Sequence, residues 1–331
     1  MTGLYDDDHV AALAAGLPAL LPAWGLAEES EVSLLSLSEN ATFLARPPGG
    51  TAPVVLRVHR PDYHRREEIA AELAWIEALR TAEILVTPAP LPLRDGGHIA
   101  ELALPGETRQ VVGFRFLSGR EPDPDAALVP GFEKLGALSA RLHRHVRGWT
   151  LPAGLTRKTW DFEAAFGPRP LWGDWRAAPG LTAEGRAVLE DLCTTLRERL
   201  AAYGTTPDRF GLIHADLRLA NLLVEGDRIG VIDFDDCGFS WFLYDFAAAI
   251  SFHETHPLVP ALQAAWLRGY ESIAPLPPEA AEMLPVLVLY RRLLLTAWIA
   301  SHGETETAQA TGLSAYTEGT LQLARAFLAR G

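Results

Sequence analysis

The sequence is short of cysteine and of positive charge, and each shortage excludes a class of protein. Two cysteines occur in 331 residues, Cys193 and Cys237, too few for a disulfide framework and without the paired spacing of a zinc site. We therefore expect a chain that works in a reducing cytoplasm. The formal net charge is −13, whereas surfaces that bind nucleic acid or anionic membranes carry clustered Lys and Arg. Small molecules or proteins are the expected partners.

Long uncharged runs are scarce, and two apolar stretches need an explanation. Residues 10–27 follow aspartates rather than basic residues and contain two prolines, which is unlike a signal peptide. We expect a helix of the folded protein there. Residues 284–300 carry Arg291 and Arg292 at their centre, and a helix that faces lipid does not tolerate such charges cheaply. The sequence therefore predicts no membrane span.

The first third of the chain has the pattern of a small, mostly antiparallel sheet with one helix. Ile69, Leu73 and Ile76 recur at helical spacing, which predicts an amphipathic helix over residues 64–80. Turn residues separate the apolar segments around it. Short strands are expected at residues 31–37, 42–45, 54–58, 99–104 and 110–116.

The rest of the chain, after a linker rich in turn residues, is mostly helical. Apolar residues recur there at helical spacing. Helices are expected at residues 132–146, 181–202, 258–270 and 279–301, with a last one ending near residue 330. The sequence thus predicts an α+β fold with an N-terminal lobe over residues 1–117 and a larger, mostly helical lobe over residues 118–331.

Residues 211–236 interrupt the helical part with short strands and turns, and irregular segments on a rigid scaffold often carry catalytic groups. If the turn at residues 225–228 closes a hairpin, residues 222–224 pair with residues 229–231.

Polar side chains flank this expected hairpin. Asn221 at its entry and Asp233 at its exit would then emerge side by side, with Asp216 on the loop just upstream. Amide and carboxylate oxygens are hard ligands, which suit Mg²⁺ holding phosphates better than Zn²⁺. The sequence therefore predicts that these oxygens converge on one point.

These residues also carry a resemblance to a known superfamily. The order His214, Asp216, Asn221 and then Asp233 resembles the catalytic loop and metal-binding aspartate of the kinase-like phosphotransferases. Within them, HADLRLANLL followed by IDFDD is similar to the aminoglycoside phosphotransferase and choline kinase group, nearest to the type II homoserine kinases, hydroxylysine kinases and stress-response kinases. The resemblance implies a bilobal protein-kinase-like fold, with ATP and Mg²⁺ as cofactors.

The resemblance assigns roles to residues of the loop. Asp216 would accept the proton of the attacking hydroxyl, while Asn221 and Asp233 would hold the Mg²⁺ that bridges the ATP phosphates. His214 fits a scaffold residue that orients the loop. Arg218 either steadies the transferring phosphoryl group or is an arginine at the surface or paired with an aspartate, and both interpretations stay open.

Two further aspartates have two interpretations each. Asp235 stands where protein kinases have glycine, as in the aminoglycoside group, so it contacts a second metal or the substrate, or it merely adds acidity to the loop. Asp245 resembles the aspartate that hydrogen-bonds the catalytic loop from below, and the alternative is a carboxylate at a helix start.

The third expected strand carries a basic residue in an apolar setting. In the resembled fold such a residue binds ATP phosphates and pairs with a glutamate on the following helix, and here only Arg57 is available, in place of the commoner lysine. Glu72 lies on the apolar stripe of the helix, so it would be buried and would need a cation. Glu68 is expected to be solvated, and we favour Glu72 as the partner.

The phosphate-binding turn lacks the usual Gly-x-Gly-x-x-Gly. Ser38, Glu39 and Asn40 stand in its place, and backbone N–H groups and the Ser38 hydroxyl are expected to cradle a phosphate. A plain hairpin turn is the alternative.

Adenine is expected to bind where the fifth strand ends. The backbone near Phe116 and Leu117 would supply hydrogen bonds, and Val55 and Leu223 would form apolar walls.

The predicted function is ATP- and Mg²⁺-dependent phosphoryl transfer to the hydroxyl of a small molecule. Acidic groups of the same region favour a cationic or zwitterionic acceptor, such as an amino alcohol or a homoserine-like hydroxy amino acid: Asp216, Asp235, Asp236 and Glu254. Alternatively, Arg291 and Arg292 hold a substrate carboxylate.

Other functions stay open at this point. A Ser/Thr protein kinase of the stress-response type is one. Residues 229–236 also resemble the start of a haloacid-dehalogenase-type phosphatase, and a non-catalytic pseudokinase is the third.

Overall fold

The computed structural model describes residues 7–38, 40–122, 128–226 and 228–330. The chain forms two compact units. The first unit comprises Met1–Glu121, Leu151–Arg157 and Leu222–Asp235, and the second comprises Pro122–Thr150, Lys158–Asn221 and Asp236–Gly331. The lobe boundary expected after residue 117 stays a prediction.

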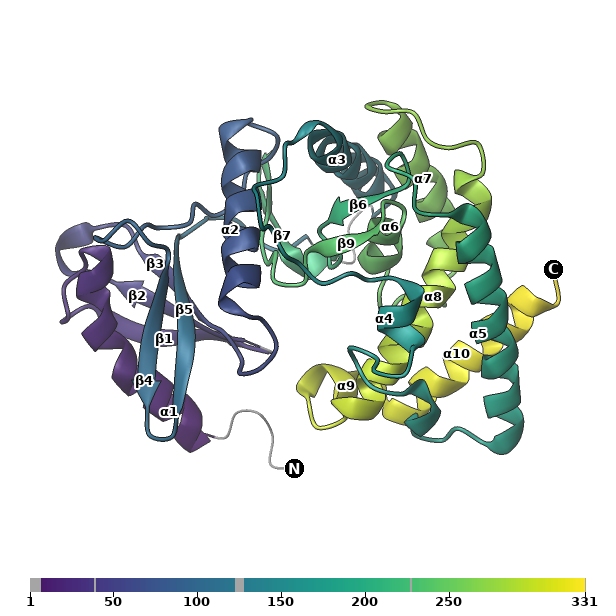
Figure 1. Cartoon of the computed structure of the whole chain (residues 1–331), viewed down its shortest axis with the longest axis horizontal. Helices are drawn as coiled ribbons and strands as arrows, with labels where there is room; N and C mark the ends of the chain where they lie inside the picture. Colours follow the sequence, from purple (N-terminus) through teal and green to yellow (C-terminus); the bar gives the residue numbers. More distant parts are fainter. Residues whose placement is uncertain (1–6, 39, 123–127, 227, 331) are drawn as a thin grey trace. The chain divides into compact units, whose positions relative to one another are not determined.

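A five-stranded antiparallel sheet is the framework of the first unit. Its strands are β1 (Glu31–Leu37), β2 (Ala41–Arg46), β3 (Val54–Val58), β4 (Ile99–Leu104) and β5 (Glu107–Arg115). They lie in the order β1-β2-β3-β5-β4 (Figure 1). All five predicted strands are confirmed, and the register places Arg57 of β3 between Thr42 and Val112, in the middle of the sheet.

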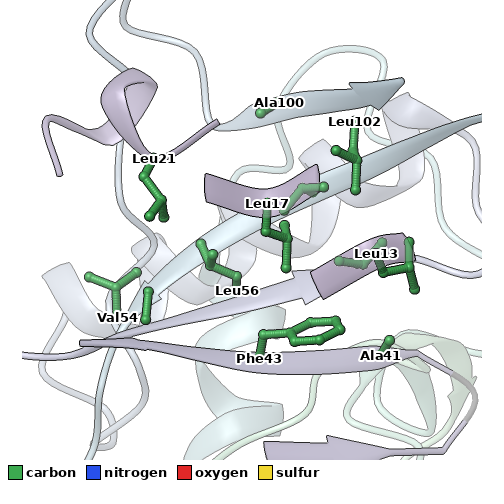
Figure 2. Packing of buried hydrophobic residues seen from close by; sticks show 12 residues of the cluster. Leu13, Leu17, Leu21, Ala41, Phe43, Val54, Leu56, Ala100 and Leu102 are labelled. Carbon is green, nitrogen blue, oxygen red and sulfur yellow. The ribbon is translucent and has the colours of Figure 1, made fainter. Parts of the chain in front are cut away.

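One face of this sheet is covered by the N-terminal helical segment. Helix α1 (Asp7–Gly16) is followed by a 3₁₀ helix, η1 (Leu17–Trp24). Figure 2 shows leucines of this segment packing on residues of the strands. Leu17 of η1 and Leu56 of β3 are both fully buried. A leucine buried in this way contributes about 1.5–3 kcal/mol relative to an exposed one. The α-helix expected over residues 10–27 ends at Gly16, earlier than predicted. The prolines that follow lack the N–H that an α-helix needs to continue.

Helix α2 (Arg66–Thr81) confirms the predicted amphipathic helix. Its buried face includes Glu72, which is fully buried. Glu68 is buried as well, so its expected solvation is wrong. The reason is its place at the helix start, where its carboxylate accepts the backbone N–H of Arg65 at 2.8 Å.

The predicted hairpin of residues 222–231 is present and belongs to the first unit. Strand β7 (Leu222–Glu225) pairs with β8 (Arg228–Val231), with Leu222 opposite Val231. Asp227 of its turn lies outside the described residues. Backbone bridges join the hairpin to the rest of its unit, including one between Val86 and Gly230. Asn221 directly precedes Leu222, and Asp233 follows Val231 by two residues. Both residues therefore flank the end of the hairpin at which Leu222 pairs with Val231.

The second unit is mostly helical. Its long helices confirm those predicted: α3 (Leu128–Gly148), α5 (Ala183–Tyr203), α7 (Val259–Glu271), α8 (Ala280–Ser301) and α10 (Leu313–Leu328). The shorter helices escaped prediction because one or two turns show no clear periodicity: α4 (Phe162–Phe166), α6 (Tyr244–Ala249) and α9 (Glu306–Thr311).

Helices α3 and α7 pack so closely that both need glycine at the contact. A Cβ atom on Gly136 would lie 2.0 Å from the carbonyl oxygen of Trp266, and one on Gly269 would lie 1.8 Å from that of Glu133. Among the described residues, α8 is the one helix long and apolar enough to cross a membrane, but 89% of that stretch is buried inside the protein.

A two-stranded sheet positions the irregular loop of the second unit. Strand β6 (Phe210–Ile213) pairs antiparallel with β9 (Gly238–Trp241). His214 directly follows β6, so the loop with Asp216 begins at a fixed edge. Strand β9 was not predicted, since its Gly-Phe-Ser-Trp sequence resembles a loop. The described chain thus confirms the α+β class, with an antiparallel N-terminal sheet and a mostly helical remainder.

Candidate active site

A strained backbone residue shapes the loop after β6. Ala215 has φ 66°, a left-handed conformation that non-glycine residues rarely adopt. Its N–H donates to Oδ1 of Asp245 at 2.9 Å, and Oδ2 of that fully buried carboxylate lies 2.9 Å from His143 Nε2. Of the two interpretations of Asp245, the contact with the loop is therefore present.

The carboxylate of Asp216 accepts hydrogen bonds from three side chains. Its Oδ2 accepts from Asn221 Nδ2 at 2.8 Å and from Arg218 Nε at 3.0 Å, and its Oδ1 accepts from Arg291 Nη2 at 2.9 Å. Burial alone would raise the pKa of Asp216, but the Arg218 and Arg291 guanidiniums lower it below its ordinary value. The group is therefore ionised near neutral pH and able to accept a proton.

The contacts of His214 and Asn221 with Asp216 fit the roles that the resemblance implies for them. His214 is buried, and its Nδ1 accepts the backbone N–H of Asp216 at 3.3 Å, as suits a scaffold residue. Asn221, in the 3₁₀ turn η4 (Leu219–Asn221), donates its amide N–H groups to Asp216. Its amide oxygen is then the atom suited to a hard cation such as Mg²⁺. This oxygen thus fits the chemistry of the implied metal.

A second charge cluster lies in the first unit, around Arg57. Arg57 Nη2 donates to both carboxylate oxygens of Glu72, at 2.7 and 2.6 Å, so the expected ion pair is present. Arg57 Nη1 lies 3.6 Å from Asp233 Oδ1. Although burial disfavours the charge, these carboxylates raise the pKa of Arg57, which is a permanent cation.

Asp233 and Asp235 differ in their surroundings. Asp233 has φ 59° and a side chain that is 46% exposed. Its carboxylate oxygens are ligands of the kind that a hard cation such as Mg²⁺ prefers.

Asp235, in contrast, is buried among cationic and imidazole groups. Its Oδ1 lies 3.4 Å from His59 Nδ1, and its Oδ2 lies 3.5 Å from His64 Nε2. Burial opposes the charge, but Arg57 and these histidines hold the pKa of Asp235 well below its usual range. Its backbone oxygen also accepts from Arg157. The metal role of Asp235 stays a prediction, and its contacts within the first unit give it a structural role.

The turn expected to bind phosphate is closed by its own backbone. Ser38 N–H donates to the carbonyl oxygen of Asn40 at 3.2 Å, so this donor is used within the turn rather than for a phosphate. The Asn40 side chain is buried, and its Oδ1 accepts the Arg60 N–H at 3.0 Å. Glu39 lies outside the described residues.

The residues expected at the adenine also make contacts within the first unit. Phe116 N–H donates to the carbonyl oxygen of Pro53 at 3.2 Å. The Leu117 side chain packs so close to Gly230 that a Cβ there would lie 2.7 Å from it. Leu223 packs in the same way against Gly119. The adenine contacts stay a prediction.

Comparison with known proteins places the chain in a family. Residues 32–283, most of the chain, match the model of the phosphotransferase enzyme family. The chain belongs to this family. It is accordingly a kinase rather than a phosphatase, and β8 ends in a two-stranded hairpin rather than opening the alternating strands and helices that the phosphatase alternative requires.

Several phosphotransferases are similar to it over most of their length. The homoserine kinase of Brucella anthropi is 31% identical over 263 residues, which cover 75% of this chain and 72% of that protein. The structure of a microcompartment-associated aminopropanol kinase is 43% identical, with a TM-score of 0.87, and covers 95% of this chain and 97% of that one. An amicoumacin kinase in complex with AMP-PNP and Ca²⁺ shares the fold at 18% identity, with a TM-score of 0.74 over 96% of this chain and 94% of that one.

These likenesses make the fold that of the kinase-like phosphotransferases, as the sequence predicts. The structure brings the predicted site residues together within each unit: Arg57, Glu72, Asp233 and Asp235 in the first, and His214, Asp216, Arg218 and Asn221 in the second.

Two contacts of this phosphotransferase were not predicted from the sequence. One is the pairing of Arg291 with Asp216, since the sequence suggested only a role for Arg291 in holding a substrate carboxylate. A charge in the middle of an apolar helix requires a buried partner, and that signal was available. The other is His59 with His64. Position 59 lies two residues beyond Arg57 along an extended segment, so both side chains share one face of the sheet.

Proposed function

We propose that this kinase transfers the γ-phosphoryl group of ATP, with Mg²⁺, to the hydroxyl group of a small amino alcohol. The 43% identity to an aminopropanol kinase over 95% of the chain supports this acceptor more than any other observation. Homoserine is the second candidate, because a homoserine kinase is 31% identical over 75% of the chain. The complex of the amicoumacin kinase with AMP-PNP and Ca²⁺ supports a nucleoside triphosphate and a divalent cation.

The proposed chemistry assigns one task to each charged group. The ionised Asp216 accepts the proton of the acceptor hydroxyl, and a placed general base contributes about 10²- to 10⁴-fold to the rate. Asn221 and Asp233 are the proposed ligands of Mg²⁺, which neutralises phosphate charge when bound. Arg57, fixed by Glu72, is proposed to bind the ATP phosphates.

The relatives support a cationic acceptor more strongly than the number of acidic residues does. Glu254 is buried in an ion pair with Arg292, so it adds no excess negative charge. The guanidiniums of Arg291 and Arg292 likewise have protein partners, which leaves no support for a role in binding a substrate carboxylate. A cationic or zwitterionic acceptor, no nucleic-acid or membrane partner and a cytoplasmic location are parts of the proposal.

Steady-state ADP release with ATP and Mg²⁺ tests the acceptor directly. The panel contains 1-amino-2-propanol, ethanolamine, homoserine, 1,2-propanediol and a serine-containing peptide. We expect the highest kcat/KM for an amino alcohol, and a much lower value for the diol because it lacks the ammonium group. A highest value for homoserine, or for the peptide, would contradict the proposed acceptor. Asp216→Asn serves as the control for contaminating ATPases.

A further inference from the structure

Two adjacent arginines are buried in the middle of helix α8. Arg291 and Arg292 are each 3% exposed, yet they point to different partners. Arg292 pairs with Glu254 and also donates to Thr320 Oγ1 at 2.9 Å and to the carbonyl oxygen of Tyr316 at 2.8 Å. Arg291 instead reaches Asp216, a residue 75 positions earlier in the chain.

The guanidinium of Arg291 is fixed on every side. Its Nε donates to Ser251 Oγ at 3.2 Å, its Nη1 to the Tyr244 hydroxyl at 2.8 Å, and its Nη2 to Asp216 Oδ1 at 2.9 Å. The Trp172 ring lies 5.0 Å from its central carbon. A planar cation held at all three nitrogens has one orientation, so it presents its Nη2 donor to Asp216 from a fixed direction.

Hydrogen bonding to Asp216 limits where a substrate can bind. An ionised carboxylate has about four lone-pair sites. Within the described part of the second unit, Arg218 and Asn221 donate to Oδ2, and Arg291 donates to Oδ1. One lone pair of Oδ1 is then left for a further donor. The contact with Arg291 sets the direction in which this lone pair points.

We propose that Arg291 is a positioning residue that orients Asp216 so that one lone pair of Oδ1 accepts the acceptor hydroxyl. The inference rests on the proposed function, in which Asp216 is the base. In the reaction, the acceptor oxygen forms a bond to the γ-phosphorus, and the bond from that phosphorus to the β,γ-bridging oxygen breaks. ADP leaves with that electron pair, and the hydroxyl proton moves to Asp216 Oδ1.

Arg218 is the weaker candidate for this role. Its side chain is 32% exposed, and it follows Asp216 by two residues, so it moves with the loop that it would have to hold. Arg291 belongs to a separate 22-residue helix, 75 positions from Asp216 in the chain. A reference fixed outside the loop defines the direction of the carboxylate, and misplacement of a reacting group by about 1 Å can cost about 100-fold.

The test compares Arg291→Met, Arg291→Lys and the matched control Arg292→Met. We expect Arg291→Met to lower kcat by about 100-fold with the KM for ATP unchanged. Arg291→Lys, which keeps the charge but loses the planar donors, should fold and lose less activity. Arg292→Met removes an equally buried cation and should lower thermal stability while kcat stays within about twofold of the wild type.

A double variant separates positioning from a general structural role. If Arg291 acts through Asp216, adding Arg291→Met to Asp216→Asn leaves the residual turnover unchanged. A wild-type kcat in Arg291→Met, or a further 100-fold loss in the double variant, would overturn the proposal.

The same series distinguishes failure of the inference from failure of the proposed function. If amino alcohols are not phosphorylated but another hydroxyl compound is, the proposed acceptor fails and the variants are compared on that compound. A crystal structure of Arg291→Lys gives a readout without turnover. We expect the Asp216 carboxylate to be rotated away from Asn221 Nδ2, and an unchanged carboxylate would overturn the proposal.

Discussion

The two units hold their central charges in opposite ways. In the first, the cation Arg57 is surrounded by the carboxylates of Glu72, Asp233 and Asp235. In the second, the carboxylate Asp216 is surrounded by the cations Arg218 and Arg291. An excess of carboxylates favours a metal ion that accompanies phosphates, whereas an excess of guanidiniums keeps a base ionised and favours an anionic phosphoryl group. The proposed function gives each cluster a different part of the same reaction.

Removing the carboxylate at the centre of the second cluster should have the largest effect. We expect Asp216→Asn to lower kcat by about 10²- to 10⁴-fold, because the amide cannot accept the hydroxyl proton. ADP release in the presence of the best acceptor measures it. Binding of AMP-PNP, followed by calorimetry, should match the wild type, and a loss of nucleotide affinity equal to the loss of turnover would contradict the division between the two clusters.

Removing the cation at the centre of the first cluster should primarily affect stability and nucleotide binding. Arg57→Met leaves the fully buried Glu72 unpaired, which should lower the free energy of unfolding by about 3–5 kcal/mol. Urea unfolding followed by circular dichroism measures it. Arg46→Met is the matched control, since Arg46 is an exposed arginine of the same sheet and its loss should cost less than about 0.5 kcal/mol. Equal losses for the two variants would show that the buried pair is not stabilising.

Asp235→Asn sharpens the contrast between the clusters through its pH dependence. The folded state holds the pKa of Asp235 well below its usual range. The resulting stabilisation is therefore complete above the unfolded pKa of about 3.9 and is lost as the pH falls from there through the folded pKa. We expect the variant to be less stable at neutral pH by about 1–3 kcal/mol and to lose less stability in acid.

Urea unfolding between about pH 5 and pH 2.5 measures the difference between Asp235→Asn and the wild type. Parallel curves for the two proteins would mean that the Asp235 carboxylate is not stabilised by Arg57 and the histidines.

Arg218→Gln should have the smallest effect on stability. Its guanidinium is partly exposed, and an ion pair of this kind contributes at most about 1 kcal/mol. If Arg218 contacts the transferring phosphoryl group, kcat falls while the thermal midpoint hardly changes. If Arg218 only pairs with Asp216, kcat stays near the wild-type value. The kcat and the thermal midpoint, measured together, decide between the two interpretations that the sequence left open.

Much of the fold could be predicted because local patterns coincide with tertiary contacts. The strand around Arg57 and the helix around Glu72 each combine apolar periodicity with one buried charge, and two such charges need each other. The hairpin of residues 222–231 follows from a polar turn between two apolar runs. Short elements such as β9 lack that periodicity, and only pairing with β6 makes it a strand.

The site was predicted less completely, because contacts between distant residues leave little local signal. The role of Asp216 followed from its motif, but the partner Arg291 lies on a helix 75 positions away. Glu68 looked solvated because the pattern did not show that it caps its own helix. Sequence reasoning thus identifies reactive groups more readily than the groups that orient them.

Phosphorus NMR of the reaction mixture tests the central claim most directly. Wild-type protein and Asp216→Asn are each incubated with ATP, Mg²⁺ and 1-amino-2-propanol, and the phosphorus resonances are followed over time. We predict that a phosphate monoester of the amino alcohol grows in step with ADP for the wild type and far more slowly for the variant. Equal rates for the two proteins, or release of inorganic phosphate alone, would contradict the account.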